Sequence, residues 1–229
     1  MTLLATPVRH PRLAAASLLA AFGLSAVSVF LQPDLAGDPD QTLATLASGP
    51  LPAVSAVTFL LAQLPFIVAY LAIGALVETR HRRLGLWGTC LAVLGAFGHT
   101  VFGGMSLLYL VMAQDPADRT LYATLITDIQ SSPVMLFSLA GLAGTVIGML
   151  TLSVGLLRSK VVTRWVAPAL WAFLLLEFVG GNISKYAGYL AVLCLGGAFT
   201  ALAAHVAGSV KPTEQSATTT ALGTASQSA

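Results

Sequence analysis

Charged residues are scarce in this chain. Only 9% of its 229 residues are Asp, Glu, Lys or Arg, whereas about a quarter of the residues in a soluble domain are charged. Hydrophobic residues account for 56% of the chain, and the mean hydropathy is +0.85. So few charges exclude an ordinary soluble globular domain. The composition therefore predicts an integral membrane protein.

Cysteine and histidine are also scarce. The two cysteines, Cys90 and Cys194, fall at different depths in the predicted helices, more than ~10 Å apart along the bundle, so we expect no disulfide. Four histidines do not supply two facing imidazoles for a haem. Zinc-ligand spacing, a phosphate-binding glycine loop and a serine nucleophile elbow are all missing from the sequence. We therefore expect no metal and no cofactor, and an enzymatic role is disfavoured.

The charges that are present alternate in sign along the chain. Basic residues precede the first apolar segment, separate the second from the third and the fourth from the fifth, and follow the sixth: Arg9 and Arg12; Arg80, Arg82 and Arg83; Arg158, Lys160 and Arg164; Lys211. The two long connections carry aspartate with a single arginine, Arg119: Asp34, Asp38 and Asp40, then Asp115, Asp118 and Asp128. Short loops rich in Lys and Arg stay in the cytoplasm, so both termini are predicted to be cytoplasmic.

Six apolar segments are long enough to cross a bilayer, which requires about 20 residues. They cover residues 13–31, 53–77, 85–112, 133–157, 162–181 and 186–208. The predicted fold is therefore all-α, a six-helix transmembrane bundle within residues 1–211. The first segment is longer than the apolar core of a secretory signal, so we expect it to be retained. Residues 212–229 are mostly Thr, Ser, Ala and Gln and are predicted to form a disordered cytoplasmic tail.

The two long connections, 32–52 and 113–132, each predict a short amphipathic helix on the outer face. Asp38 and Asp115 can cap these helices, and each is followed by a proline, which suits the first helical position. In the second connection the apolar residues recur at helical spacing: Leu121, Leu125 and Ile129, with Tyr122 and Ile126 beside them.

Several matched elements recur at a nearly constant offset. Asp38-Pro39 and Asp115-Pro116 are 77 residues apart, and both lead into similar Thr-Leu and Ala-Thr-Leu sequences. Trp87 precedes His99 by 12 residues, and Trp165 precedes Glu177 by the same 12. Such spacing is expected if helical hairpins were duplicated in tandem, but alanine- and leucine-rich helices also match by chance, so both explanations stay open.

Two ionisable residues lie well inside predicted crossings. His99 and Glu177 each follow an interfacial tryptophan by 12 residues, or about 18 Å of helix, so both lie at a similar depth. Gln63 falls within about one turn of the same level. Polar groups at this depth usually face the bundle interior, one another or a water-filled cavity. We therefore predict a buried polar centre of His99, Glu177 and Gln63, with His99 and Glu177 paired.

Small and aromatic residues supply predicted packing positions and anchors. Gly144 and Gly148 have the G-x-x-x-G spacing of close helix packing, and Gly141 extends that face. Gly95 and Gly103 belong to a stripe of small residues on the predicted third crossing. Trp87 and Trp165 stand next to basic clusters and are interpreted as interfacial anchors.

The run from Val134 ends in Leu156-Leu157-Arg158-Ser159 and is followed by Arg164-Trp165. This arrangement resembles a recurrent feature of small, uncharacterised bacterial multi-pass membrane proteins, over roughly residues 133–180. The resemblance implies a membrane location and packed helices, and it assigns no catalytic or binding residue.

These features leave three functional hypotheses. The first is a small transport or ion- or proton-coupled module centred on Gln63, His99 and Glu177; the second is a non-catalytic accessory or structural protein. A membrane-embedded enzyme acting on lipid or quinone is the third. Eight Arg against three Lys, with a single Asn, favour a GC-rich bacterium and hence the inner, cytoplasmic membrane. The expected partner is the lipid bilayer and not nucleic acid, because the basic clusters lack interleaved aromatic residues. A protein partner or a homo-oligomer is left open.

Overall fold

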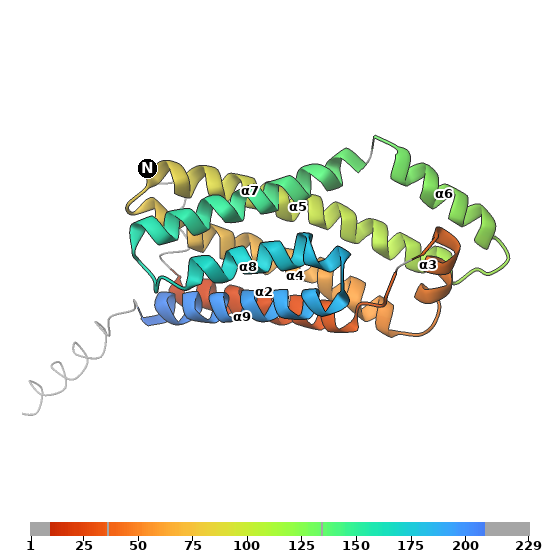
Figure 1. Cartoon of the computed structure of the whole chain (residues 1–229), viewed down its shortest axis with the longest axis horizontal. Helices are drawn as coiled ribbons and strands as arrows, with labels where there is room; N and C mark the ends of the chain where they lie inside the picture. The colour runs from red at the N-terminus through yellow and green to blue at the C-terminus, as the bar shows by residue number, and fades with distance from the viewer. Residues whose placement is uncertain (1–9, 36, 134, 209–229) are drawn as a thin grey trace, which may run out of the picture.

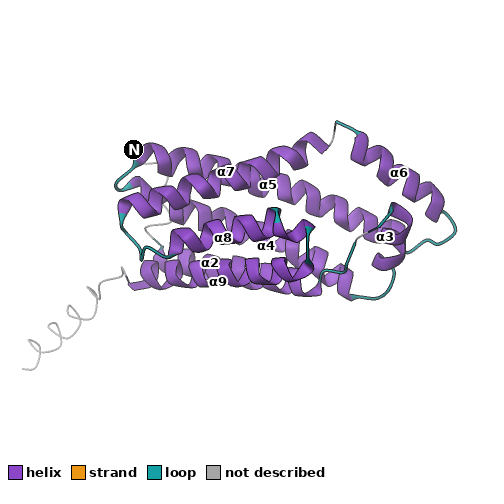
Figure 2. Cartoon of the chain, in the orientation of Figure 1, coloured by secondary structure: helices purple, strands orange, loops and turns teal. Residues whose placement is uncertain are grey.

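The computed structural model of the chain describes residues 10–35, 37–133 and 135–208. This described part is 85% helical and contains no strand (Figure 2). The predicted tail, residues 212–229, lies outside the described residues, as do Arg9 and Lys211. The all-α prediction is therefore confirmed for the part of the chain that the structure describes.

Five helices in the described residues are long and apolar enough to cross a membrane. They are α2 (Pro11–Leu31), α4 (Leu51–Glu78), α5 (Arg82–Ala113), α7 (Met135–Ser159) and α9 (Lys185–Gly208). Each of the five contains one predicted crossing in full, except that α7 begins two residues after the start of the predicted segment 133–157. The shortest has 21 residues, or about 31 Å at 1.5 Å per residue, which matches the thickness of a bilayer core.

The remaining predicted crossing, 162–181, is shorter than expected. Its helix, α8 (Val166–Phe178), has 13 residues and is about 20 Å long. The helix ends just before Gly180-Gly181, which lie in a single 3-10 turn, η1 (Gly180–Asn182). Because glycine weakens a helix interior, this pair favours the early end of α8. The turn leads directly into α9, which packs antiparallel against α8 (Figure 1).

The five long helices and α8 alternate in direction along the chain, so their connections lie at two ends of the bundle (Figure 1). We call one the basic end, because its two connections carry Arg80, Arg82 and Arg83, and Arg158, Lys160 and Arg164. The other, the acidic end, holds Asp34, Asp38, Asp40, Asp115, Asp118 and Asp128. Within the bundle, α5 packs between α4 and α7, and α2 packs between α4 and α9.

Glycine allows the backbones of α5 and α7 to touch. A Cβ atom built on Gly141 would lie 2.6 Å from the Cα of Gly98, and one built on Gly144 would lie 2.9 Å from the nitrogen of Gly95. Real Cβ atoms do not approach backbone atoms so closely, so these positions require glycine. Such contact maximises van der Waals packing, which holds membrane helices together.

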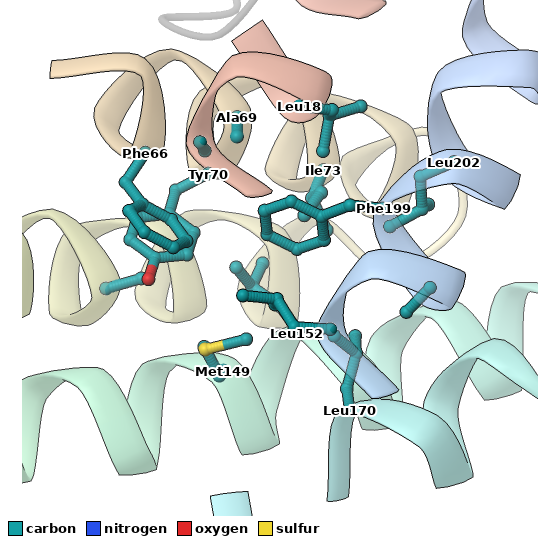
Figure 3. Close-up of a cluster of buried hydrophobic side chains, with 14 of the residues drawn as sticks. Leu18, Phe66, Ala69, Tyr70, Ile73, Met149, Leu152, Leu170, Phe199 and Leu202 are labelled. Atoms are coloured by element: carbon teal, nitrogen blue, oxygen red, sulfur yellow. The ribbon is translucent and has the colours of Figure 1, made fainter. Parts of the chain in front are cut away.

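Buried hydrophobic side chains fill the half of the bundle toward the basic end (Figure 3). Phe199 of α9 is fully buried and makes an edge-to-face contact with Phe66 of α4, with ring centroids 5.8 Å apart. Leu152 of α7 and Leu170 of α8 belong to the same cluster, and both are 1% exposed. This half of the bundle is therefore closed by packed side chains.

Two short helices lie side by side at the acidic end, α3 (Pro39–Leu46) and α6 (Arg119–Ser131) (Figure 1). As predicted, Asp38 caps α3, and its Oδ1 accepts a hydrogen bond of 2.8 Å from the amide of Gln41. The predicted cap at Asp115 is wrong. Its Oδ1 accepts from the amide of Ala117 at 3.0 Å within a turn, and the helix begins only at Arg119.

The apolar residues of α3 and α6 form a second, smaller core with the end of α5. Its buried members are Leu43, Leu46, Met112, Ala113 and Ile126. On α6 the inward face is centred on Ile126 and not on the predicted stripe, because Leu121 and Leu125 are 63% and 40% exposed. The packed face thus follows Tyr122 and Ile126 and leaves these two leucines outside the bundle.

Reciprocal serine bonds join α2 and α4. Ser28 Oγ donates to the carbonyl of Ser55 at 3.0 Å, and Ser55 Oγ donates to the carbonyl of Ser28 at 2.9 Å. We expect Ser55→Ala to lower the free energy of unfolding by about 1 kcal/mol, because one buried interhelical bond is lost. The matched control is Thr58→Ala, since Thr58 bonds only within α4. Equal effects of the two substitutions on unfolding in detergent would contradict this prediction.

Candidate functional site

A cavity of about 650 Å³ lies in the half of the bundle toward the acidic end. It reaches the middle of α7 and α9 at Thr145 and Leu195, and it extends to α3 and α6 at Thr42 and Gln130. All eight described α-helices contribute residues to its wall. The packed core around Phe199 forms its floor, because Phe66 contacts Phe199 and also lines the cavity.

The three residues of the predicted polar centre all line this cavity. Gln63 comes from α4, His99 from α5 and Glu177 from α8. The fold therefore brings together side chains that are up to 114 residues apart in the sequence. The expected direct pair is not formed: within the described residues, His99 and Glu177 share neither a hydrogen bond nor an ion pair.

His99 is instead held by its own helix and by α7. Its Nδ1 lies 2.9 Å from the carbonyl oxygen of Gly95 and 3.2 Å from Thr145 Oγ1. A carbonyl oxygen can only accept, so Nδ1 carries the proton in the Gly95 bond. In the neutral ring, Nε2 is then an acceptor, and it has no partner among the described residues.

Gln63 is buried and only partly satisfied. Its side chain is 5% exposed, and its Nε2 donates to the carbonyl of Phe59 at 3.0 Å, one turn back along α4. No hydrogen bond in the described part of the chain involves Oε1 of Gln63. The cavity wall therefore contains a second hydrogen-bond acceptor without a donor, Gln63 Oε1, in addition to His99 Nε2.

Glu177 lies near the end of α8, where the helix gives way to η1. Within residues 10–35, 37–133 and 135–208, its carboxyl group makes no hydrogen bond and no ion pair. By contrast, an oxygen of the Glu78 carboxylate at the basic end lies 3.8 Å from Arg82 Nε and forms an ion pair with it. Glu177 is therefore the one acidic side chain in the cavity wall, and it is unpaired there.

Other polar residues in the wall were not identified from the sequence, among them Tyr70, Ser138 and Thr145. Tyr70 follows Gln63 by seven residues on α4, so both share one helix face. Thr145 interrupts the glycine face of α7, which is the signal that could have revealed it. Ser138 lies two turns earlier on α7, and its Oγ is buried without a partner in the described residues.

The other predicted residues lie outside the polar centre. Gly95, Gly141, Gly144 and Gly148 are buried between α5 and α7, and Gly103 faces α4, where a Cβ would lie 3.1 Å from Leu60 Cδ1. Trp87 and Trp165 are 64% and 50% exposed near the basic end. Cys90 and Cys194 are free thiols.

The described residues contain no group of three or more His, Cys, Asp or Glu side chains that could hold a metal ion. The chain matches no protein-family model, no curated protein and no solved structure.

Proposed function

We propose that this chain is a small proton-coupled transport module that takes its cargo into the cavity at the acidic end. The observation that carries the proposal is the unpaired carboxyl group of Glu177 in the wall of a cavity. Ionisable groups inside membrane proteins usually mark substrate or proton pathways, because burying them is costly. Here α4, α5 and α8 bring Gln63, His99 and Glu177 to one cavity, and these side chains are not hydrogen-bonded to one another.

The proposal includes six membrane crossings in a bacterial inner membrane, with both termini in the cytoplasm. In this arrangement α8 and η1 together make the fifth crossing, and α9 makes the sixth. The basic end then faces the cytoplasm, since Lys and Arg loops are retained there. The cavity opens toward the outer side, and the core around Phe199 separates it from the cytoplasm.

In the same proposal, α3 and α6 are the two outer-face amphipathic helices. Thr42 of α3 and Gln130 of α6 line the cavity, so both helices stand at its mouth. The exposed Leu121 and Leu125 of α6 suit contact with the lipid interface. A gate at this position would control access of cargo from outside.

A purely structural role would give these polar residues a different arrangement. In that case His99 and Glu177 would be expected to bond directly and to lock α5 against α8. The bonds of His99 to Gly95 and Thr145 leave Glu177 unpaired, which favours the transport proposal. A lipid-modifying or quinone-dependent enzyme is less well supported. Nδ1 of His99 is bonded to a carbonyl and cannot also serve Thr145 as a base, and in the described residues no hydroxyl or thiol is hydrogen-bonded to Nε2.

Trp171 provides a test of proton coupling. Its Nε1 donates to Ser153 Oγ at 2.6 Å, and this bond joins α8 to α7 on the basic side of the cavity. If protonation of Glu177 shifts α8, the emission of Trp171 should change with pH in protein carrying Trp87→Phe and Trp165→Phe. Glu177→Gln should remain folded and lose this response, because the ionisable group is gone.

The same measurement on His99→Gln and on the double substitution separates the contributions of the two residues. A pH response that persists in the double substitution would contradict the proposal. Emission that is independent of pH in the otherwise unaltered protein would contradict it too. Circular dichroism of each variant checks that the fold is retained.

A further inference from the structure

The cavity wall has an acidic charge and no basic one. Glu177 lines the cavity, whereas the lysines and arginines of the described residues lie elsewhere. The titratable side chains that accompany Glu177 there are His99, Tyr70 and Tyr109. An anionic ligand would find no counter-charge in such a cavity, and burying it would be costly. A cation, however, would have a counter-charge in the carboxylate of Glu177.

Unpaired acceptors surround the same space. They are the Glu177 carboxylate, Gln63 Oε1 and His99 Nε2, none of which has a hydrogen-bond partner in the described part of the chain. A protonated amine presents N–H donors and a positive charge to such groups. A bare metal ion is a poorer match, because the described residues contain no group of three or more His, Cys, Asp or Glu side chains that could hold one.

The rest of the wall is aromatic and apolar. Phe59, Phe66, Phe102 and Phe173 line it, together with Tyr70 and Tyr109. The rings of Phe59 and His99 lie 5.9 Å apart, so an aromatic face adjoins the polar centre. Aromatic faces attract organic cations through the ring quadrupole, most strongly where water is excluded. Apolar substituents on the ligand would be buried against the same rings.

We infer that this cavity binds a hydrophobic organic cation, with Glu177 as its counter-charge and the phenylalanines as its walls. The inference rests on the proposed function and names the class of cargo that the site accepts. The aspartates at the acidic end would raise the local concentration of cations near the mouth. Substituted ammonium and phosphonium ions belong to this class, whereas metal ions and carboxylates do not.

The test compares two probes of the same shape and opposite charge. Tetraphenylphosphonium and tetraphenylborate both carry four phenyl rings, so size and hydrophobicity are matched. The full-length protein is placed in nanodiscs of uncharged phosphatidylcholine, and binding is measured by calorimetry against protein-free nanodiscs. We expect saturable binding of the phosphonium ion, at least about tenfold tighter than binding of the borate ion.

Three variants locate the binding site. Glu177→Gln should weaken phosphonium binding by about tenfold or more, because the counter-charge is removed. Glu177→Asp keeps the charge and should restore most of the affinity, which guards against a loss caused by misfolding. Glu78→Gln is the matched control. It removes a carboxylate of the basic end, outside the cavity, and should leave the affinity unchanged.

Equal affinity for the two probes would overturn the inference, as would unchanged phosphonium binding in Glu177→Gln. Either result is distinguishable from failure of the proposed function, which is read from the pH response of Trp171. A pH response without phosphonium binding would retain the transport proposal and exclude this cargo class. Phosphonium binding without a pH response would retain the binding site and exclude proton coupling.

Discussion

Gly98→Leu should separate α5 from α7 and destabilise the bundle by about 3 kcal/mol. A Cβ at this position would overlap the Cα of Gly141 and would lie 2.8 Å from its nitrogen. Neither backbone can yield without moving a whole helix, so a leucine cannot be accommodated by rotamer changes alone. Since α5 and α7 share the longest interface of the bundle, the loss should appear as a large fall in thermal stability.

The matched control is Gly104→Leu on the same helix. A Cβ built on Gly104 meets no atom within 4 Å, so the new side chain points into open space. We expect this variant to unfold within about 0.5 kcal/mol of the unaltered protein. Unfolding in mixed micelles, followed by circular dichroism, measures both variants. Similar stability of Gly98→Leu and Gly104→Leu would show that the two helices do not pack as described.

Phe199→Ala should also lower the free energy of unfolding by about 3 kcal/mol, by a different mechanism. The ring is fully buried and contacts Phe66 at the boundary between the packed core and the cavity. Removing it leaves a void that the surrounding helices can only partly fill. The floor of the cavity would be opened at the same time. Thermal unfolding of the purified protein is again the measurement.

Phe97→Ala is the control for this substitution, because Phe97 is also on a long helix but is 57% exposed on the outside of the bundle. Its loss should have little effect on unfolding, since lipid or detergent can replace its contacts. A stability loss in Phe97→Ala as large as that in Phe199→Ala would contradict the placement of the core.

The long helices were predictable because each is an uninterrupted apolar run bounded by charges or prolines. Their bounds in the structure differ from the predicted ones by three residues at most, apart from those of α8. The early end of α8 was harder to predict, because Val179 and Ile183 are as apolar as the helix they follow. The glycine pair that favours this end changes the mean hydropathy of the segment little. Local chemistry predicted the Asp38 cap, but the start of α6 at Arg119 depended on the turn in which the Asp115 carboxylate accepts from the amide of Ala117.

Depth along the helices identified Gln63, His99 and Glu177 as candidates, because polar side chains are conspicuous in apolar runs. Which of them would bond to which could not be read from depth alone. The partner of His99 is decided by the contact of α5 with α7, where glycines bring Thr145 within 3.2 Å of Nδ1. The cavity could not be predicted either, since its volume depends on side chains from eight helices.

Two serines provide the most direct test of the proposal that the cavity opens at the acidic end on the outer side and is closed toward the cytoplasm. Ser106 of α5 lines the cavity and is only partly buried, whereas Ser153 of α7 is fully buried in the packed half. Single cysteines at these positions, in protein carrying Cys90→Ala and Cys194→Ala, are treated in intact cells with a membrane-impermeant thiol reagent. Thr127→Cys, on the exposed face of α6, is the positive control.

We expect labelling of Ser106→Cys and Thr127→Cys from outside the cell, and no labelling of Ser153→Cys. Prior incubation with tetraphenylphosphonium should slow the labelling of Ser106→Cys and leave that of Thr127→Cys unchanged. Labelling of Ser106→Cys only in inverted membrane vesicles would contradict the proposal, because the cavity would then open to the cytoplasm.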